Sequence, residues 1–300
     1  MILIFDLGTQ SFRTTVLDRN GHRHFEWSRP VRSNLNGNIA EQNPSDWKSA
    51  LEDSFREILQ CDFATKIQAI TATGTLSGLV CLDENGDCLH PAILYSDRRA
   101  ASYLASIELR PEFQHSGWRA YSGDFLPQLC YLKNEEPHIY QKSRWLLDST
   151  GYLNFLLTGK ATLDRYTTYT CYSDAGTQEL NPHLFHQLGI DRNKLGQIVH
   201  PGELLGMASQ LSHAQVLSVS YDSAAAYLGS ELNQPGDSLD ISGTVTSFGV
   251  VSSTRVIDPA RRVFSIPFQD KWLVRGSTAM SGGVLEWARK NLFDQQFDQL

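Results

Sequence analysis

The chain has 300 residues, 41% of them hydrophobic and 20% charged, a composition typical of a globular protein with one large or two ordinary domains. Its formal net charge of -7 argues against any general attraction to nucleic acid or to an anionic membrane surface. The 5 cysteines, an odd number without CxxC spacing, favour reduced thiols over a disulfide framework. No basic leader precedes the apolar start, and no apolar run approaches the roughly 20 residues of a membrane span, so we expect a cytoplasmic protein.

The first third of the chain predicts strands and one long helix. Short β-branched, apolar runs indicate the strands, and Asn20-Gly21 is a typical hairpin turn between two of them. Asn43-Pro44 precedes a helical pattern over residues 46–60, with apolar side chains four residues apart. The predicted strands are 2–5, 14–17, 24–27, 66–73 and 79–82.

The rest of the chain ends in a second group of strands. Residues 99–158 have a mostly helical pattern, and residues 176–206 are rich in loop formers. Beyond them the predicted strands are 238–241, 245–251, 262–267 and 271–275, followed by a helix over 281–292. A strand, a Gly-Thr turn and a returning strand thus occur twice, once near each end of the chain.

The first of these turns, in the sequence DLGTQSFR, has the residues of a phosphate site. Gly8 allows close approach of a ligand to the backbone, and Thr9, Gln10 and Ser11 add N–H and side-chain donors. Arg13 adds a permanent cation. Asp6 would repel phosphate unless a Mg²⁺ ion lay between the two, so it is the candidate metal ligand. The alternative is an ordinary hairpin with a capping aspartate.

Several segments in this order resemble the FGGY carbohydrate kinases, and most closely the xylulokinase branch. Besides the first turn they are EQNPSDW at 41–47, GLVCLDENGDCLHPAILYSDRRA at 78–100, LTGKATLDRYTTYT at 157–170, YDSAAAYLG at 221–229 and SGTVTSFGV at 242–250. The resemblance implies an α/β fold of the actin/hexokinase/Hsp70-like (ribonuclease H-like) class, with mixed sheets. It also implies ATP and Mg²⁺ bound together with a sugar or polyol, and it assigns Gly243 and Thr244 to the second phosphate turn.

The resemblance also assigns the chemistry of sugar phosphorylation. Asp222 aligns with the general base that removes the proton from the attacking sugar hydroxyl; the alternative is that it only caps the helix that follows. The segment of Asp97 would line the sugar pocket, whereas an ion pair with Arg98 or Arg99 is the alternative for that carboxylate.

The sugar side departs from the xylulokinase pattern. Xylulokinases have Gly-Gln-Met-His-Gly where residues 74–78 read Gly-Thr-Leu-Ser-Gly, so Thr75, Leu76 and Ser77 become the candidate sugar contacts. Tyr221 and Ser223 flank the aligned base where the family usually has Gly and Asn, and Ser223 is a further candidate contact. These changes leave the identity of the sugar open.

The resemblance predicts a sugar-binding domain over residues 1–236 and the beginning of an ATP-binding domain over 237–300. We therefore expect either a piece of a longer kinase or a chain completed by another, such as a homodimer partner. An ATP-dependent kinase for a ketose such as xylulose or ribulose is the favoured function. A non-catalytic sugar-binding or regulatory relative is the alternative, and an actin- or Hsp70-like ATPase explains fewer of the segments.

Overall fold

The structure is a computed structural model in which residues 1–114, 118–168, 180–242, 246–278 and 281–292 are described. The chain divides into two compact units. Residues 1–116 and 120–225 form unit 1, and residues 117–119 and 226–300 form unit 2. The predicted domain boundary at residue 236 stays a prediction.

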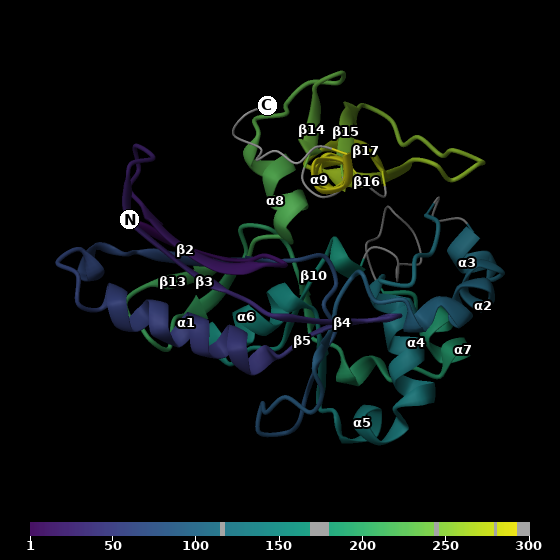
Figure 1. Cartoon of the computed structure of the whole chain (residues 1–300), viewed down its shortest axis with the longest axis horizontal. Coiled ribbons are helices and arrows are strands. Elements are labelled where there is room, and N and C mark those ends of the chain that lie inside the picture. The colour runs from purple at the N-terminus through teal and green to yellow at the C-terminus, as the bar shows by residue number, and fades with distance from the viewer. Residues whose placement is uncertain (115–117, 169–179, 243–245, 279–280, 293–300) are drawn as a thin grey trace. The chain divides into compact units, whose positions relative to one another are not determined.

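Unit 1 is built on a six-stranded mixed sheet with the order β12-β13-β6-β1-β2-β3. Figure 1 labels β2, β3 and β13 of this sheet. β1 (Ile2–Leu7) pairs antiparallel with β2 (Ser11–Leu17) and parallel with β6 (Ala69–Gly74). The carboxyl ends of β1 and β6 therefore lie at the same edge, where the first turn and the 74–78 segment begin. The other strands are β3 (Arg23–Pro30), β12 (Leu204–Met207) and β13 (Gln215–Leu217).

Two helices cover one face of this sheet. Alternate residues of β1 are buried, and the Phe5 ring lies 5.1 Å from that of Phe55 on α1 (Pro44–Ile58). Trp47 on α1 in turn lies 6.1 Å from Tyr152 on α6 (Ser149–Thr158), so both helices share one core. Because side chains alternate along a strand, Asp6 lies on the opposite face of β1 from this core.

The predicted helix over 46–60 is confirmed with slightly earlier bounds. The side chain of Asn43 accepts a hydrogen bond from the Ser45 amide, and Pro44 occupies the first helical position, so α1 begins at Pro44. It ends at Ile58, with Leu59 as the last capping residue.

Two predicted intervals are corrected in detail. The interval 99–158 is mostly helical, but β9 (Trp145–Leu147) interrupts it and pairs with β7 (Val80–Leu82). Within the loop-rich interval 176–206 lies a helix, α7 (Pro182–Leu188), which Asn181 caps and Gly189 ends with a left-handed backbone. The short helices of the first interval are α2 (Leu104–Glu108), α3 (Pro111–Gln114), α4 (Phe125–Glu135) and α5 (Pro137–Lys142), after a 3₁₀ turn at Arg99–Tyr103.

Smaller sheets extend unit 1 around the predicted sugar segments. One has the order β4-β5-β8, and another pairs β10 (Thr162–Asp164) with β11 (Gln197–Val199) in parallel. The strands of the first are β4 (Ser33–Asn36), β5 (Ile39–Gln42) and β8 (Ala92–Ile93), and 3₁₀ turns lie at Ala64–Lys66 and Arg192–Lys194. Helix α8 (Asp222–Gly229) begins at the end of unit 1.

Unit 2 contains a four-stranded antiparallel sheet with the order β14-β15-β17-β16. Its strands and its helix agree with the elements predicted for this part of the chain. They are β14 (Ser238–Ser242), β15 (Thr246–Ser252), β16 (Phe264–Phe268), β17 (Lys271–Thr278) and α9 (Gly282–Leu292). Among the described residues, no helix has both the length and the apolar character that a membrane crossing requires.

Candidate active site

The first predicted phosphate turn joins β1 to β2. The Gly8 amide donates to the Ser11 carbonyl at 2.9 Å, which closes the turn over Thr9 and Gln10. The side chain of Gln42 donates to the Thr9 carbonyl at 2.8 Å and so ties the turn to β5. A Cβ atom on Gly8 would lie 3.3 Å from the guanidinium of Arg13, so glycine leaves room for this side chain.

Asp6 and Arg13 are cross-strand partners beside this turn. The Arg13 guanidinium lies 2.7 Å from Asp6 Oδ2, and the Arg13 side chain is 56% exposed. The other carboxylate oxygen, Asp6 Oδ1, is buried and has no hydrogen-bond partner in the described part of the chain. Burial raises the pKa of Asp6, and the charge of Arg13 opposes that rise. The turn therefore combines an exposed cation with a buried carboxylate oxygen that has no partner among the described residues.

The 74–78 segment follows β6 and contains Thr75, Leu76 and Ser77. Ser77 is buried, its backbone has φ +60°, and its hydroxyl oxygen has no hydrogen-bond partner among the described residues. A left-handed backbone is unusual for a serine, and a buried hydroxyl without a partner is costly. Thr75 is also buried, whereas Leu76 is half-buried.

The beginning of α6 holds this segment in place. The Ser149 hydroxyl donates to the Thr75 carbonyl at 2.7 Å, and the Ser149 amide donates to the Ser77 carbonyl at 2.9 Å. The Gly74 amide donates to the hydroxyl of Thr150 at 3.1 Å. A Cβ atom on Gly74 would lie 2.6 Å from the Ser149 hydroxyl, so this close approach requires glycine.

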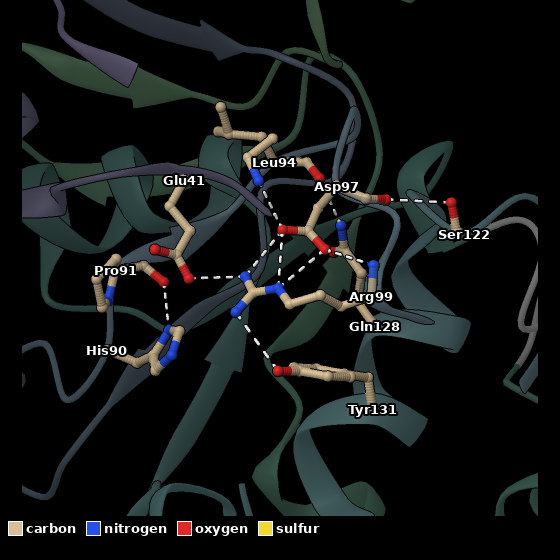
Figure 2. Close-up of polar contacts among 10 residues, drawn as sticks. Glu41, His90, Pro91, Leu94, Asp97, Arg99, Ser122, Gln128 and Tyr131 are labelled. Atoms are coloured by element: carbon tan, nitrogen blue, oxygen red, sulfur yellow. Dashed lines mark hydrogen bonds and ion pairs between the residues drawn. The ribbon is translucent and has the colours of Figure 1, made fainter. Parts of the chain in front are cut away.

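Asp97 is buried in an ion-pair network, which Figure 2 shows. Its Oδ2 accepts from the Ala40 amide and from Arg99 Nη2, both at 2.8 Å. The same guanidinium lies 2.7 Å from Glu41. Burial disfavours the charge on Arg99, but the hydrogen bonds and charges of the two carboxylates outweigh burial and raise the pKa of Arg99. The ion pair predicted as the alternative role of Asp97 is therefore present, and a contact with sugar stays a prediction.

The surrounding chain is tied to the same network. Ser122 donates its hydroxyl to the Asp97 carbonyl at 3.1 Å, and Gln128 on α4 donates to the Leu94 carbonyl at 2.9 Å. The phenol oxygen of Tyr131 lies 3.4 Å from Arg99 Nη1 (Figure 2). Two segments distant in sequence, residues 40–41 and 122–131, thus fix the loop that carries Asp97.

Asp222 is exposed and is the first residue of α8. Its Oδ1 accepts from the Ser223 amide at 2.6 Å. An N-cap side chain accepts from an amide two or three residues further on, so the capping role stays a prediction. The preceding residues, Ser220 and Tyr221, are both buried. A carboxylate at a helix N-terminus is stabilised in its ionised form, which is the form that a general base needs.

Two buried carboxylates, Asp148 and Asp164, are connected to this segment by hydrogen bonds. The sequence analysis did not single them out. Asp148 caps α6, and Asp164 at the end of β10 accepts from the Ser220 hydroxyl at 2.8 Å. Burial and the neighbouring charge of Asp164 raise the pKa of Asp148 to about 7, and burial also raises the pKa of Asp164. Asp164 belongs to the 157–170 segment that carries the family resemblance, and its place in that segment was a usable signal.

The second predicted phosphate turn, with Gly243 and Thr244, lies outside the described residues. The strands that flank it, β14 and β15, pair antiparallel as β1 and β2 do. In the described ranges, no group of three or more His, Cys, Asp or Glu side chains is placed to hold a metal ion. Asp6 stays the predicted metal ligand.

Residues 1–222 match the model of the N-terminal domain of the FGGY family of carbohydrate kinases. The chain belongs to this family. It is 25% identical over 328 residues to the xylulose kinase of Bacillus subtilis (strain 168), covering 100% of this chain and 64% of that protein. It is also 25% identical over 318 residues to the L-fuculokinase of Escherichia coli (strain K12), covering 97% of this chain and 66% of that protein.

Solved structures of the FGGY kinases share the fold. The xylulose kinase of Lactobacillus acidophilus superposes with a TM-score of 0.87 at 21% identity, over 100% of this chain and 64% of that one. Plasmodium falciparum glycerol kinase with ADP also gives a TM-score of 0.87, at 17% identity, over 99% of this chain and 65% of that one. The predicted family, its xylulokinase-like branch and the predicted fold class are thereby confirmed. The chain spans 62–64% of the length of three curated xylulose kinases that it matches.

Proposed function

We propose that this protein transfers a phosphoryl group from ATP to a hydroxyl of a sugar or polyol, most closely as a kinase of ketoses such as xylulose or ribulose. One observation supports this proposal above the others. The Thr73 hydroxyl on β6 donates to the Ser220 carbonyl at 2.7 Å, so the segment ending in Asp222 is attached to the strand that leads into residues 74–78. This hydrogen bond therefore connects the segment that ends in the predicted base to the strand that leads into the predicted sugar segment.

In this proposal Asp222 is the general base. A sugar hydroxyl is a poor nucleophile at neutral pH, and its proton must leave as the oxygen bonds to phosphorus. The exposed carboxylate of Asp222 accepts that proton, and the first turn of α8 keeps the carboxylate ionised until then. The Ser223 side chain, half-buried beside it, is a candidate contact for the substrate.

Phosphate binding falls to the turn between β1 and β2. The exposed Arg13 guanidinium contacts the transferred phosphoryl group, and Thr9, Gln10 and Ser11 supply neighbouring donors. Asp6 Oδ1, buried and without a partner in the described chain, fits a role in holding the Mg²⁺ ion of Mg-ATP, which neutralises phosphate charge. Gly8, Gly243 and Thr244 stay predicted members of the phosphate site.

Sugar recognition falls to residues 74–78 and to the Asp97 loop. Ser77 has the strongest local support, because a substrate hydroxyl would satisfy its buried oxygen and account for its strained backbone. Thr75 and Leu76 share its segment, and the ion pair with Arg99 holds the Asp97 loop rigid. A homodimer and a cytoplasmic location stay predictions from the sequence.

The test is a panel of ketoses and polyols with Mg-ATP in an assay of ADP release, on the longest form of the protein that carries this chain. Asp222→Asn keeps the shape and an oxygen that can accept from the Ser223 amide but cannot accept a proton, so we expect kcat to fall on the order of 10²–10⁴-fold with little change in sugar affinity. Asp46→Asn, which removes an acidic residue from the first turn of α1, is the matched control.

Each outcome of this panel discriminates between functions. ADP release with one ketose and its loss in Asp222→Asn supports the kinase. Sugar binding without ADP release on any substrate would instead favour the non-catalytic relative. Full turnover by Asp222→Asn would show that Asp222 is only a helix cap, and Asp97 would become the next candidate base.

A further inference from the structure

The segment that enters α8 is tied to a buried carboxylate. Ser220 is fully buried, and its hydroxyl lies 2.9 Å from Oδ1 and 2.8 Å from Oδ2 of Asp164. The Tyr221 amide also donates to Asp164 Oδ2, at 3.4 Å. Asp164 thus holds the two residues that directly precede Asp222.

Asp164 is itself rigidly held. Its amide donates to Asp148 Oδ2 at 2.9 Å, and its Oδ2 accepts from the Thr167 amide at 3.1 Å. Asp148 also caps α6 through the Gly151 amide. A Cβ atom on Gly151 would lie 2.1 Å from the Thr162 carbonyl, so the first turn of α6 and β10 are in close contact. The beginning of α6 therefore supports both the 74–78 segment and, through Asp164, the segment of Asp222.

We propose that Asp164 is a positioning residue, which sets the direction of the Asp222 carboxylate through the Ser220 hydroxyl and the Tyr221 amide. This inference rests on the proposed role of Asp222 as the base. It adds a residue that does not touch the substrate but determines where the base lies. Two hydrogen bonds hold Ser220: its carbonyl accepts from the Thr73 hydroxyl, and its own hydroxyl donates to Asp164.

Burial and charge favour this role over a purely stabilising one. A carboxylate that is 2% exposed, next to a second at 0%, loses hydration that its hydrogen bonds only partly replace. Apolar residues of similar size generally stabilise such an interior at least as well. Apolar residues cannot accept hydrogen bonds from the Ser220 hydroxyl and the Tyr221 amide, so they cannot hold these groups in place. Their position matters because a displacement of about 1 Å at a reacting group costs on the order of 100-fold in rate.

The test combines Ser220→Ala with Asp222→Asn in the form of the protein that phosphorylates sugar. Ser220→Ala removes only the hydroxyl link, and we expect kcat to fall by about 10-fold or more while the sugar KM changes less than about two-fold. Ser54→Ala is the matched control, since Ser54 is also fully buried and its hydroxyl donates to the Leu51 carbonyl within α1. It should leave kcat unchanged.

The double variant separates positioning from a general loss of structure. If Ser220 acts through Asp222, the double variant is no slower than Asp222→Asn alone, because the base that Ser220 orients is already lost. Losses that multiply would overturn the inference. A normal kcat in Ser220→Ala together with a slow Asp222→Asn would also overturn it and leave the proposed function standing. A normal rate in Asp222→Asn would instead refute the base on which both rest.

A second measurement does not depend on turnover. In Asp164→Asn we expect the Tyr221 amide to exchange its hydrogen at least about 10-fold faster, while amides in the middle of α1 keep their protection. Unchanged exchange at Tyr221 would show that Asp164 does not hold this segment.

Discussion

Replacing Asp148 by Asn should change how the stability of the protein depends on pH. Burial and the charge of Asp164 raise the pKa of Asp148 from 3.8 to about 7 in the native state. Between these values the folded chain holds a proton that the unfolded chain has released. The free energy of unfolding therefore decreases as pH rises through this window, and the loss is complete above the folded pKa. About three pKa units, at about 1.4 kcal/mol each, correspond to a loss on the order of 4 kcal/mol.

Urea unfolding at about pH 5 and about pH 8 covers about two of these three pKa units, so the stability should fall by about 3 kcal/mol between the two measurements. Asn does not titrate, so the variant should lose less stability than the wild type over the same interval. At about pH 5 the variant should be the less stable of the two, because the Asn NH2 group replaces one of the two oxygens that accept from the Gly151 and Asp164 amides. Ser54→Ala lowers stability without removing a titrating group and should keep the wild-type slope. Equal slopes for wild type and Asp148→Asn would refute the assignment of the raised pKa.

Three further substitutions test the proposed site. Arg13→Ala should weaken nucleotide binding by about 10- to 100-fold in calorimetry without loss of the fold. Arg23→Ala, at an exposed arginine, is the control, and an unchanged nucleotide affinity in Arg13→Ala would remove the turn from the site. Arg99→Met leaves Asp97 buried without its cation and should lower the free energy of unfolding by about 3–5 kcal/mol, whereas a change below about 1 kcal/mol would contradict the importance of the network. Ser77→Gly removes the left-handed serine and should raise stability by about 1 kcal/mol while it weakens sugar binding; unchanged sugar affinity would take Ser77 out of the pocket.

Local patterns in the sequence were sufficient for the elements closest to the site. Short β-branched, apolar runs predicted β1 and β2, and the Asn43-Pro44 pair predicted the start of α1, because each signal lies within a few residues of the element it determines. The predictions were poorer for β9, a strand of only three residues that exists because β7 pairs with it. Its partner lies far away in the chain, and no local pattern reveals it.

The candidate site likewise has parts that the sequence predicts and parts that only the tertiary structure reveals. The turn from Asp6 to Arg13 and the start of α8 at Asp222 are encoded in contiguous residues, so the sequence by itself determined where they lie in the chain. Only the tertiary structure decided that Arg99 pairs with both Asp97 and Glu41, and that Asp164 holds Ser220 from a position 56 residues away. The physical reason is that burial and long-range hydrogen bonds arise when separate segments pack together. A carboxylate's partner and its pKa depend on that packing more than on its neighbours in the chain.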